Sequence, residues 1–214
     1  MLYRTRIKIC GLTRPEDAAA AVAAGADAVG VVLAPSKRQV TLEQAARVLA
    51  DVPPFVARVG VFVDPTSDQV SEAVRALGLT AVQLHGDESP GFCAAAPVPA
   101  IKAVKVGTTF APEMVEPFRD SAAAVLLDTL VTGTSGGTGK AFDWHTITAL
   151  PGWAPLMLAG GLDPANVADA IRLLHPYAVD VSSGVEDAPG IKNPILIRSF
   201  VAAVRAADEE ALDV

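Results

Sequence analysis

Six polar residues stand at the ends of apolar segments or in the turns that follow them, where a reactive side chain would be held in place. They are Cys10, Arg38, Gln83, His85, Lys102 and Asp128. A thiol and a carboxyl group can act as general base and general acid, and a guanidinium group pairs with a carboxylate. If the apolar segments are strands of a parallel barrel, these ends meet at the face where barrel active sites lie. We therefore take the six as candidate site residues.

Cys10 ends the segment Arg6–Cys10, two positions after Lys8. Side chains two positions apart on a strand point the same way, so we expect both inside a barrel. A nearby cation favours the thiolate, and we expect Lys8 to lower the pKa of Cys10 below its usual value of about 8.5. The alternative is that Cys10 is a small buried apolar residue, the interpretation given to Cys93 within an expected helix.

Asp128 follows the apolar run Ala123–Leu127, where burial raises the pKa of a carboxyl group unless a partner offsets it. Its alternative role is to cap the next loop. His85 and Asp87 could ligate a metal, but no second set of histidine and carboxylate stands on the other strands. We therefore favour a hydrogen-bonding role for His85 and expect no metal. Lys102 could form a Schiff base or act as a cation in the barrel floor, and both options stay open.

Two glycine turns follow the last two apolar strands of the chain. Gly160-Gly161 comes after Pro155–Ala159, and Ser183-Gly184 comes after Ala178–Val181. Glycine allows close approach of the backbone to a ligand, and successive N–H groups suit a phosphate. In an eight-fold barrel the loops after strands seven and eight commonly hold one. We expect a phosphorylated small-molecule substrate, unless the glycines only make tight turns.

Strand-like segments recur about every twenty-five residues and alternate with helical patterns, which predicts parallel βα units. The eight expected strands are Arg6–Cys10, Ala28–Leu33, Val56–Val63, Ala81–His85, Ala100–Val104, Ala123–Asp128, Pro155–Ala159 and Ala178–Val181. The length suits one large core. The predicted fold class is α/β, a single-domain eight-stranded parallel (βα)8 TIM barrel over residues 1–214.

Capping signals predict where several helices begin. Thr13 is expected to cap the first helix, and Thr41 with Gln44 to form a capping box for the second. Pro112–Arg119 predicts a short fifth helix, and Phe142–His145 the start of the sixth.

Composition excludes several classes of protein. Acidic residues outnumber basic ones by 24 to 17, and no Lys/Arg-rich block occurs, so we expect no nucleic-acid or anionic-membrane partner. The 51% of apolar residues include no run of about eighteen that could span a bilayer, and no signal peptide is visible. We expect a cytoplasmic protein. Two cysteines without zinc spacing predict neither a disulfide framework nor a structural metal.

Several motifs, in this order along nearly the whole chain, resemble the phosphoribosylanthranilate isomerase family. They are Lys8–Thr13, Pro35–Arg38, Val82–Gly86, Leu127–Thr129, Gly136–Trp144, Leu158–Leu162, Asp180–Glu186 and Gly190–Lys192. The resemblance implies a cofactor-free Amadori rearrangement of N-(5′-phosphoribosyl)anthranilate in tryptophan biosynthesis. One departure is that the second loop, Ala34–Gln39, is a residue shorter than the family's usual loop and lacks its tyrosines.

The resemblance also implies roles for individual residues. Cys10 would be the general base, Asp128 the general acid, and Arg38 the partner of the anthranilate carboxylate. The residues assigned to substrate binding are Arg38, Gln83, His85, Gly160, Gly161, Ser183 and Gly184. The chemistry agrees, because opening an N-glycoside needs an acid at the ring oxygen and the following tautomerisation needs a base at C2′, without metal or nicotinamide.

Two other functions compete with this interpretation. One is a metal-dependent phosphosugar isomerase or epimerase on the same barrel, which would need additional acids and histidines on inner strands. The other is a non-catalytic phosphosugar-binding module, against which Cys10 and Asp128 argue. As partners we expect only the small phosphorylated substrate and, at most, a second copy of the chain, so that the protein is a monomer or a homodimer.

Overall fold

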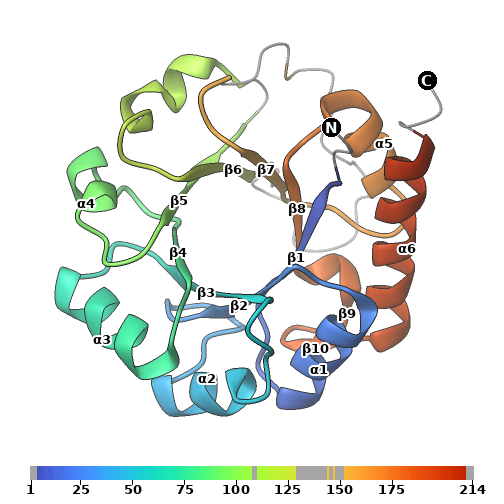
Figure 1. Ribbon diagram of the computed structural model, residues 1–214, viewed down its shortest axis with the longest axis horizontal. Coiled ribbons are helices and arrows are strands. Elements are labelled where there is room, and N and C mark those ends of the chain that lie inside the picture. The colour runs from blue at the N-terminus through green and yellow to red at the C-terminus, as the bar shows by residue number, and fades with distance from the viewer. Residues whose placement is uncertain (1–3, 108–109, 129–143, 145–146, 148–151, 211–214) are drawn as a thin grey trace.

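The computed structural model describes residues 4–107, 110–128, 144, 147 and 152–210. Eight parallel strands form a closed barrel in chain order, and β1 pairs with β8 to close it (Figure 1). The barrel strands are β1 (Arg6–Ile9), β2 (Ala28–Val32), β3 (Ala57–Phe62), β4 (Ala81–Leu84), β5 (Ala100–Lys105), β6 (Ala124–Asp128), β7 (Leu156–Ala159) and β8 (Ala178–Val181). Each overlaps its predicted segment, and the (βα)8 barrel is confirmed.

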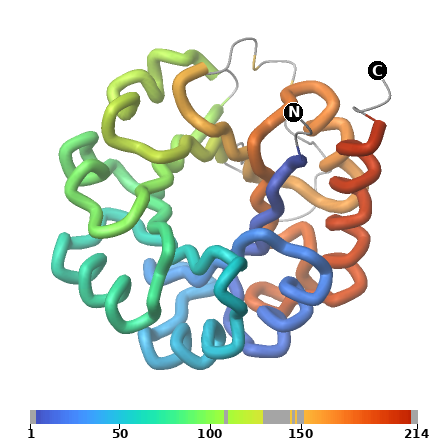
Figure 2. Tube along the Cα trace, in the orientation of Figure 1, coloured from blue at the N-terminus to red at the C-terminus, as the bar shows by residue number. Residues whose placement is uncertain are grey.

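The α-helices form a ring outside the strands (Figure 1). They are α1 (Pro15–Ala24), α2 (Leu42–Leu49), α3 (Ser67–Leu77), α4 (Pro90–Ala94), α5 (Val167–Leu174) and α6 (Pro194–Glu210). The chain passes once around the barrel, so that α6 packs against α1 as well as α5 (Figure 2). No helix in the described ranges is long and apolar enough to cross a membrane.

The predicted N-terminal cap is present in α2 and absent in α1. The Thr41 side chain accepts from the backbone N–H of Gln44, whose side chain returns the bond, so the capping box of α2 is confirmed. The cap predicted for α1 is wrong, because Arg14 holds the N-cap position without a side-chain cap. Thr13 instead donates its hydroxyl to the carbonyl oxygen of Gly190 at 2.5 Å. This bond ties the loop after β1 to the turn before α6.

The segment Pro112–Arg119 forms two 3-10 turns, η1 (Pro112–Met114) and η2 (Glu116–Phe118), rather than the predicted α-helix. Pro117 lacks an N–H donor and disfavours helical geometry at the residue before it, so a regular turn of α-helix cannot continue there. The predicted sixth helix at 142–145 lies outside the described residues, apart from Trp144.

A short insertion separates β8 from α6. It consists of the 3-10 turn η4 (Ser183–Val185) and an antiparallel hairpin of β9 (Glu186–Ala188) and β10 (Ile191–Lys192). The sequence pattern does not predict this hairpin. It places Glu186 and Lys192 close to the C-terminal end of the barrel.

Side chains alternate along each strand between two apolar layers. Ile7, Ile9 and Leu84 are fully buried between strands and helices. The inner layer fills the barrel with Val59, Ile101, Ala103, Ala124, Leu126, Met157, Ala159 and Ala178. Lys8 stands opposite Asp180 in the β1–β8 register. The apolar layer and the buried polar residues together make a packed floor, above which the strand ends are open for a site.

Candidate active site

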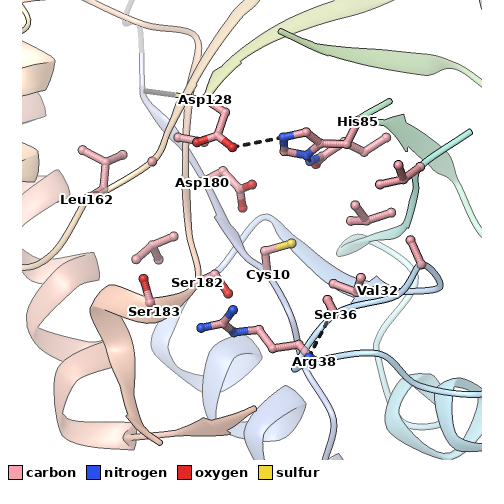
Figure 3. Close-up of a pocket in the computed structure, with 18 of the residues that line it drawn as sticks. Cys10, Val32, Ser36, Arg38, His85, Asp128, Leu162, Asp180, Ser182 and Ser183 are labelled. Atoms are coloured by element: carbon pink, nitrogen blue, oxygen red, sulfur yellow. Dashed lines mark hydrogen bonds and ion pairs between the residues drawn. The ribbon is translucent and has the colours of Figure 1, made fainter. Parts of the chain in front are cut away.

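A cavity of about 280 Å³ opens at the C-terminal ends of the barrel strands (Figure 3). The predicted site residues that line it are Cys10, Arg38, Gln83, His85, Asp128, Gly160, Gly161 and Ser183. The barrel therefore brings together side chains that lie up to 173 positions apart, from Cys10 to Ser183. Gly184 and Lys102 do not line the cavity.

Cys10 lies at the centre of this group, with Asp180 and Arg38 on either side of it (Figure 3). Its side chain is 7% exposed and interacts electrostatically with the ammonium group of Lys8. A Cβ atom on Gly30 of β2 would lie 2.9 Å from the Cys10 sulfur and 3.3 Å from Lys8 Nζ. Because Gly30 has no side chain, there is room beside it for both the Cys10 thiol and the Lys8 ammonium group.

The pKa of Cys10 is raised rather than lowered. Burial raises it most, the Asp180 carboxylate raises it further, and the opposing effects of Lys8 and Lys192 are smaller. The expectation that Lys8 would lower the pKa of the thiol is thus wrong in its net direction. Burial also lowers the pKa of Lys8, but Asp180 at 2.9 Å and Cys10 outweigh this, and the pKa of Lys8 is raised.

A line of hydrogen bonds connects Lys8 to Asp128. Lys8 Nζ donates to Gln83 Oε1 at 3.0 Å, and Gln83 Nε2 lies 3.1 Å from His85 Nδ1. His85 Nε2 in turn lies 3.0 Å from Asp128 Oδ2. Both ring nitrogens of His85 are therefore engaged by protein groups, as its predicted hydrogen-bonding role requires.

Arg38 reaches the cavity with its guanidinium group held by a protein carboxylate. Its Nε and Nη2 donate to the two oxygens of Glu186 at 2.7 and 2.6 Å. Lys192 Nζ donates to Glu186 as well, at 2.7 Å, and to the Ser182 carbonyl at 3.0 Å. Gly11 has φ +73°, and a Cβ there would lie 2.5 Å from Arg38 Cδ. The loop after β1 and the β9–β10 hairpin thus fix the direction of the Arg38 side chain.

Burial and the two neighbouring cations act on the pKa of Glu186 in opposite senses. Burial raises the pKa of this carboxyl, but the hydrogen bonds from Arg38 and Lys192 outweigh burial and hold it below its usual value. Glu186 is therefore an anion that keeps two cations beside the cavity.

The two glycine turns form one wall of the cavity. Gly160 and Gly161 have φ values of +84° and +69°, a conformation that favours glycine, and both line the cavity. Within the described residues, no hydrogen bond uses the backbone N–H of Gly161 or Ser183. A Cβ on Gly184 would overlap the carbonyl oxygen of Leu162, so Gly184 allows the two turns to pack together rather than facing the cavity.

Lys102 has neither of the two roles left open for it. Its Nζ donates to Glu88 at 2.6 Å and to the carbonyl oxygen of Gly86 at 2.5 Å, and lies 5.7 Å from the centre of the Phe118 ring. These partners lie outside the barrel wall. Lys102 fastens the loop that follows His85 instead of entering the floor or the cavity.

Three charged residues of the site are not predicted from the sequence pattern: Asp180, Glu186 and Lys192. Asp180 stands in an apolar strand, and a strict two-residue alternation with Ser182 is the signal that would have placed both inside the barrel. Glu186 and Lys192 lie beyond the last strand, and only the hairpin brings them back to Arg38.

Comparisons with known proteins agree with this geometry. The family model of N-(5′-phosphoribosyl)anthranilate (PRA) isomerase matches residues 7–203. The N-(5′-phosphoribosyl)anthranilate isomerase of Chromohalobacter salexigens is 51% identical over 206 residues, which cover 95% of this chain and 95% of that protein. One from Pseudomonas fluorescens is 52% identical, covering 94% of this chain and 98% of its own.

Solved structures show the same similarity in three dimensions. The phosphoribosyl anthranilate isomerase of Thermotoga maritima has a TM-score of 0.84 and 43% identity, covering 94% of this chain and 99% of its own. A phosphoribosyl anthranilate isomerase in complex with reduced 1-(o-carboxyphenylamino)-1-deoxyribulose 5-phosphate has a TM-score of 0.78 and 39% identity, with coverage of 94% and 99%. The chain therefore belongs to the N-(5′-phosphoribosyl)anthranilate isomerase family and is an isomerase of tryptophan biosynthesis.

Proposed function

We propose that residues 1–214 form one catalytic domain that rearranges N-(5′-phosphoribosyl)anthranilate by general acid-base catalysis, with Cys10 as the base and Asp128 as the acid. The observation that carries the proposal is that a thiol directly after β1 and a carboxyl group at the end of β6 line the same cavity. Arg38 and the two glycine turns bind the substrate. Gln83 and His85, the other two residues expected to bind it, line the cavity but are engaged by Lys8, by each other and by Asp128, so their role is to hold the acid in place. The reaction needs one acid and one base within reach of a single sugar ring.

The acid and the base act in sequence. Asp128 donates a proton to the ring oxygen while the bond from C1′ to that oxygen breaks, and the anilino nitrogen supplies electrons to form a protonated Schiff base. Cys10, as thiolate, then removes the proton from C2′, and the electron pair of that bond moves towards the Schiff base to give an enolamine. Proton transfer from the C2′ hydroxyl group to C1′ completes the ketone, so substrate and product have the same composition.

Burial shapes the dependence on pH. Because burial and Asp180 raise the pKa of Cys10, the thiolate fraction is small at neutral pH, and kcat/KM should rise with pH as the thiol ionises. We expect a rising limb of the kcat/KM profile that extends above neutral pH and is absent from the profile of Cys10→Ala.

Two ends of the substrate are held by different chemistry. The phosphate is proposed to accept hydrogen bonds from the backbone of Gly160-Gly161 and of Ser183, which line the cavity, and Gly184 contributes by letting the two turns pack closely. The anthranilate carboxylate is proposed to meet Arg38. Since Glu186 engages one edge of that guanidinium, the carboxylate would use N–H groups on its other edge.

The decisive experiment combines complementation with kinetics. The wild-type gene should restore growth to a tryptophan auxotroph that lacks this isomerase. Cys10→Ala and Asp128→Asn should each lower kcat by about a hundredfold or more, the usual scale for loss of an acid or base. Cys93→Ala is the matched control, since Cys93 lies buried on α4, away from the cavity. An active Cys10→Ala enzyme would return Cys10 to a packing role.

Assembly and cellular location are part of the same proposal. One structural relative, from Thermotoga maritima, is described as a dimeric phosphoribosylanthranilate isomerase from which monomers were generated. For this chain the alternatives remain a monomer or a homodimer, and sedimentation equilibrium separates them. We propose that it acts in the cytoplasm, and fractionation of cells that express the tagged chain tests this.

A further inference from the structure

Five side chains, four on barrel strands and one directly after β4, are hydrogen-bonded in series at the C-terminal end of the barrel. They are Asp180, Lys8, Gln83, His85 and Asp128. The series begins at a buried ion pair, in which Lys8 is 1% and Asp180 is 7% exposed. It ends at the hydrogen bond between His85 and Asp128, across the cavity from Arg38 (Figure 3). A buried charge at one end is thus connected to the proposed catalytic acid at the other.

The direction of every bond in the series follows from its first member. An ammonium group only donates, so the Gln83 atom that faces Lys8 at 3.0 Å must be the amide oxygen. The amide nitrogen of Gln83 is then the atom that faces His85 Nδ1 at 3.1 Å, and it can only donate. His85 Nδ1 must accept, and the ring hydrogen must lie on Nε2. That hydrogen points at Asp128 Oδ2, 3.0 Å away.

The direction of these hydrogen bonds determines which oxygen of Asp128 can carry the acidic proton. Because Oδ2 of Asp128 accepts from His85, a proton carried by Asp128 belongs on Oδ1. With the opposite tautomer, His85 Nε2 would be an acceptor and would draw the acidic proton towards itself and away from the substrate. The tautomer of His85 therefore decides which oxygen of the carboxyl group holds the transferable proton.

We propose that Lys8 and Gln83 are positioning residues, which fix the Nε2–H tautomer of His85 and thereby orient the acidic proton of Asp128 towards the substrate. The inference rests on the acid role proposed for Asp128. Lys8 also interacts electrostatically with Cys10, so a single buried ammonium group acts on the base and is connected through hydrogen bonds to the acid. The barrel interior could have been filled with apolar side chains, as it is one layer below, and the charged line costs free energy to bury.

The wild-type protein supplies the first test. NMR of isotope-labelled imidazole nitrogens distinguishes a ring nitrogen that carries hydrogen from one that does not, and a His85→Asn variant assigns the signals of His85. We expect the hydrogen of His85 on Nε2 in the protein without substrate. A hydrogen on Nδ1 would overturn the inference without any variant at position 83. His175, exposed at the end of α5, provides an internal reference.

Two substitutions at position 83 then test the mechanism. Gln83→Met keeps the length of the side chain and removes the donor, so His85 should show both tautomers. Gln83→Glu places a carboxylate oxygen opposite Nδ1, so Nδ1 should gain a hydrogen. In both variants kcat should fall by about tenfold to a hundredfold while KM stays within about threefold, the pattern for loss of alignment rather than of binding. Unchanged tautomer and unchanged kcat in Gln83→Met would overturn the inference.

The remaining comparisons separate this inference from the function on which it rests. Full activity of Asp128→Asn would remove the proposed acid, whereas the His85 tautomer would still be read in that variant. If Asp128→Asn is inactive but Gln83→Met and Gln83→Glu are fully active with altered tautomers, the acid role stands and the positioning role is wrong. A rise in KM alone would show instead that Gln83 contacts the substrate directly, which also contradicts the inference. Arg6→Met, two positions before Lys8 on β1, is the control for a lost cation on that strand and should leave the His85 signals unchanged.

Discussion

Lys8 and Lys102 are both buried lysines on barrel strands, and each pairs with a carboxylate, yet they serve different parts of the molecule. Lys8 is 1% exposed and lies 2.9 Å from Asp180, whereas Lys102 is 4% exposed and lies 2.6 Å from Glu88. Lys8 is bonded to the residues of the cavity, and Lys102 to a loop outside the barrel wall. Burial and pairing are nearly the same, so neither distinguishes a functional lysine from a structural one.

The difference comes from the phase of each strand. Ile101 and Ala103, the neighbours of Lys102 on β5, belong to the inner layer of the barrel, so Lys102 points outwards to the helices. On β1 the neighbours Ile7 and Ile9 belong to the outer layer, so Lys8 points inwards. A shift of one residue along a strand would exchange the two environments.

The largest expected effect is on stability, at the outer pair. Lys102→Met leaves Glu88 buried and without its cation, and breaking a buried pair in this way costs about 3–5 kcal/mol. Because Lys102 does not line the cavity, kcat of the folded variant should change by less than about threefold. Urea unfolding and steady-state kinetics on the same sample check both values. A stable but inactive Lys102→Met enzyme would contradict the structural role assigned to Lys102.

Loss of the inner pair, Lys8 and Asp180, should affect kcat more than stability. Lys8→Met removes the ammonium group that contacts Cys10 and Gln83, and kcat should fall by about a hundredfold, the scale for disturbance of acid-base catalysis. The double variant Lys8→Met/Asp180→Asn also removes the unpaired carboxylate and should regain much of the stability lost in Lys8→Met while remaining slow. Recovery of kcat in that double variant would show that Lys8 serves folding alone.

Two strand glycines, Gly30 and Gly60, also differ in whether they adjoin the cavity residues or the layer between strands and helices. A Cβ on Gly30 would meet Cys10 Sγ at 2.9 Å and Lys8 Cε at 3.2 Å, whereas a Cβ on Gly60 would meet Leu79 Cδ1 at 2.6 Å. Gly30→Ala should therefore lower kcat by about tenfold through displacement of the thiol. Gly60→Ala should cost about 1–3 kcal/mol of stability by overpacking and leave kcat nearly unchanged. Equal effects on kcat for both alanine variants would contradict the assignment of faces.

Sequence periodicity was sufficient to predict the barrel strands because each is an apolar run flanked by turns and helices. It could not set the phase of β5, since Ala100–Val104 has apolar residues on both faces and Lys102 fits either. The β9–β10 hairpin was missed for another reason. Its strands of three and two residues are held by pairing with each other rather than by an apolar face, and they leave no periodic signal.

The candidate site, too, could be predicted from the sequence only in part. Cys10, His85 and Asp128 could be singled out as candidates because reactive types at strand ends are few, and the three line one cavity. The hydrogen bonds that join them were not, since Lys8, Gln83 and Asp180 meet only after β1 closes on β8. A strand pattern shows which residues share a face of one strand, but not which side chains meet across a barrel.

The smallest expected effect is a difference in the acid dependence of stability, and it tests the outer pair alone. Burial raises the pKa of Glu88, but hydrogen bonds from Lys102 and from the backbone outweigh burial and hold the pKa below its usual value. A carboxyl group whose folded pKa lies below its unfolded one stabilises the protein above the unfolded pKa of about 4.3, and this contribution is lost as pH falls through the folded pKa. In Lys102→Met the pKa of Glu88 should rise, so less of that acid-sensitive stability remains to be lost.

The free energies of unfolding of the wild type and of Lys102→Met should therefore converge as the pH falls from neutral. A difference between them that stays constant would show that Lys102 does not stabilise the Glu88 carboxylate. Lys8→Met leaves Glu88 and Lys102 unchanged, so this Glu88-linked part of the acid dependence should persist in that variant.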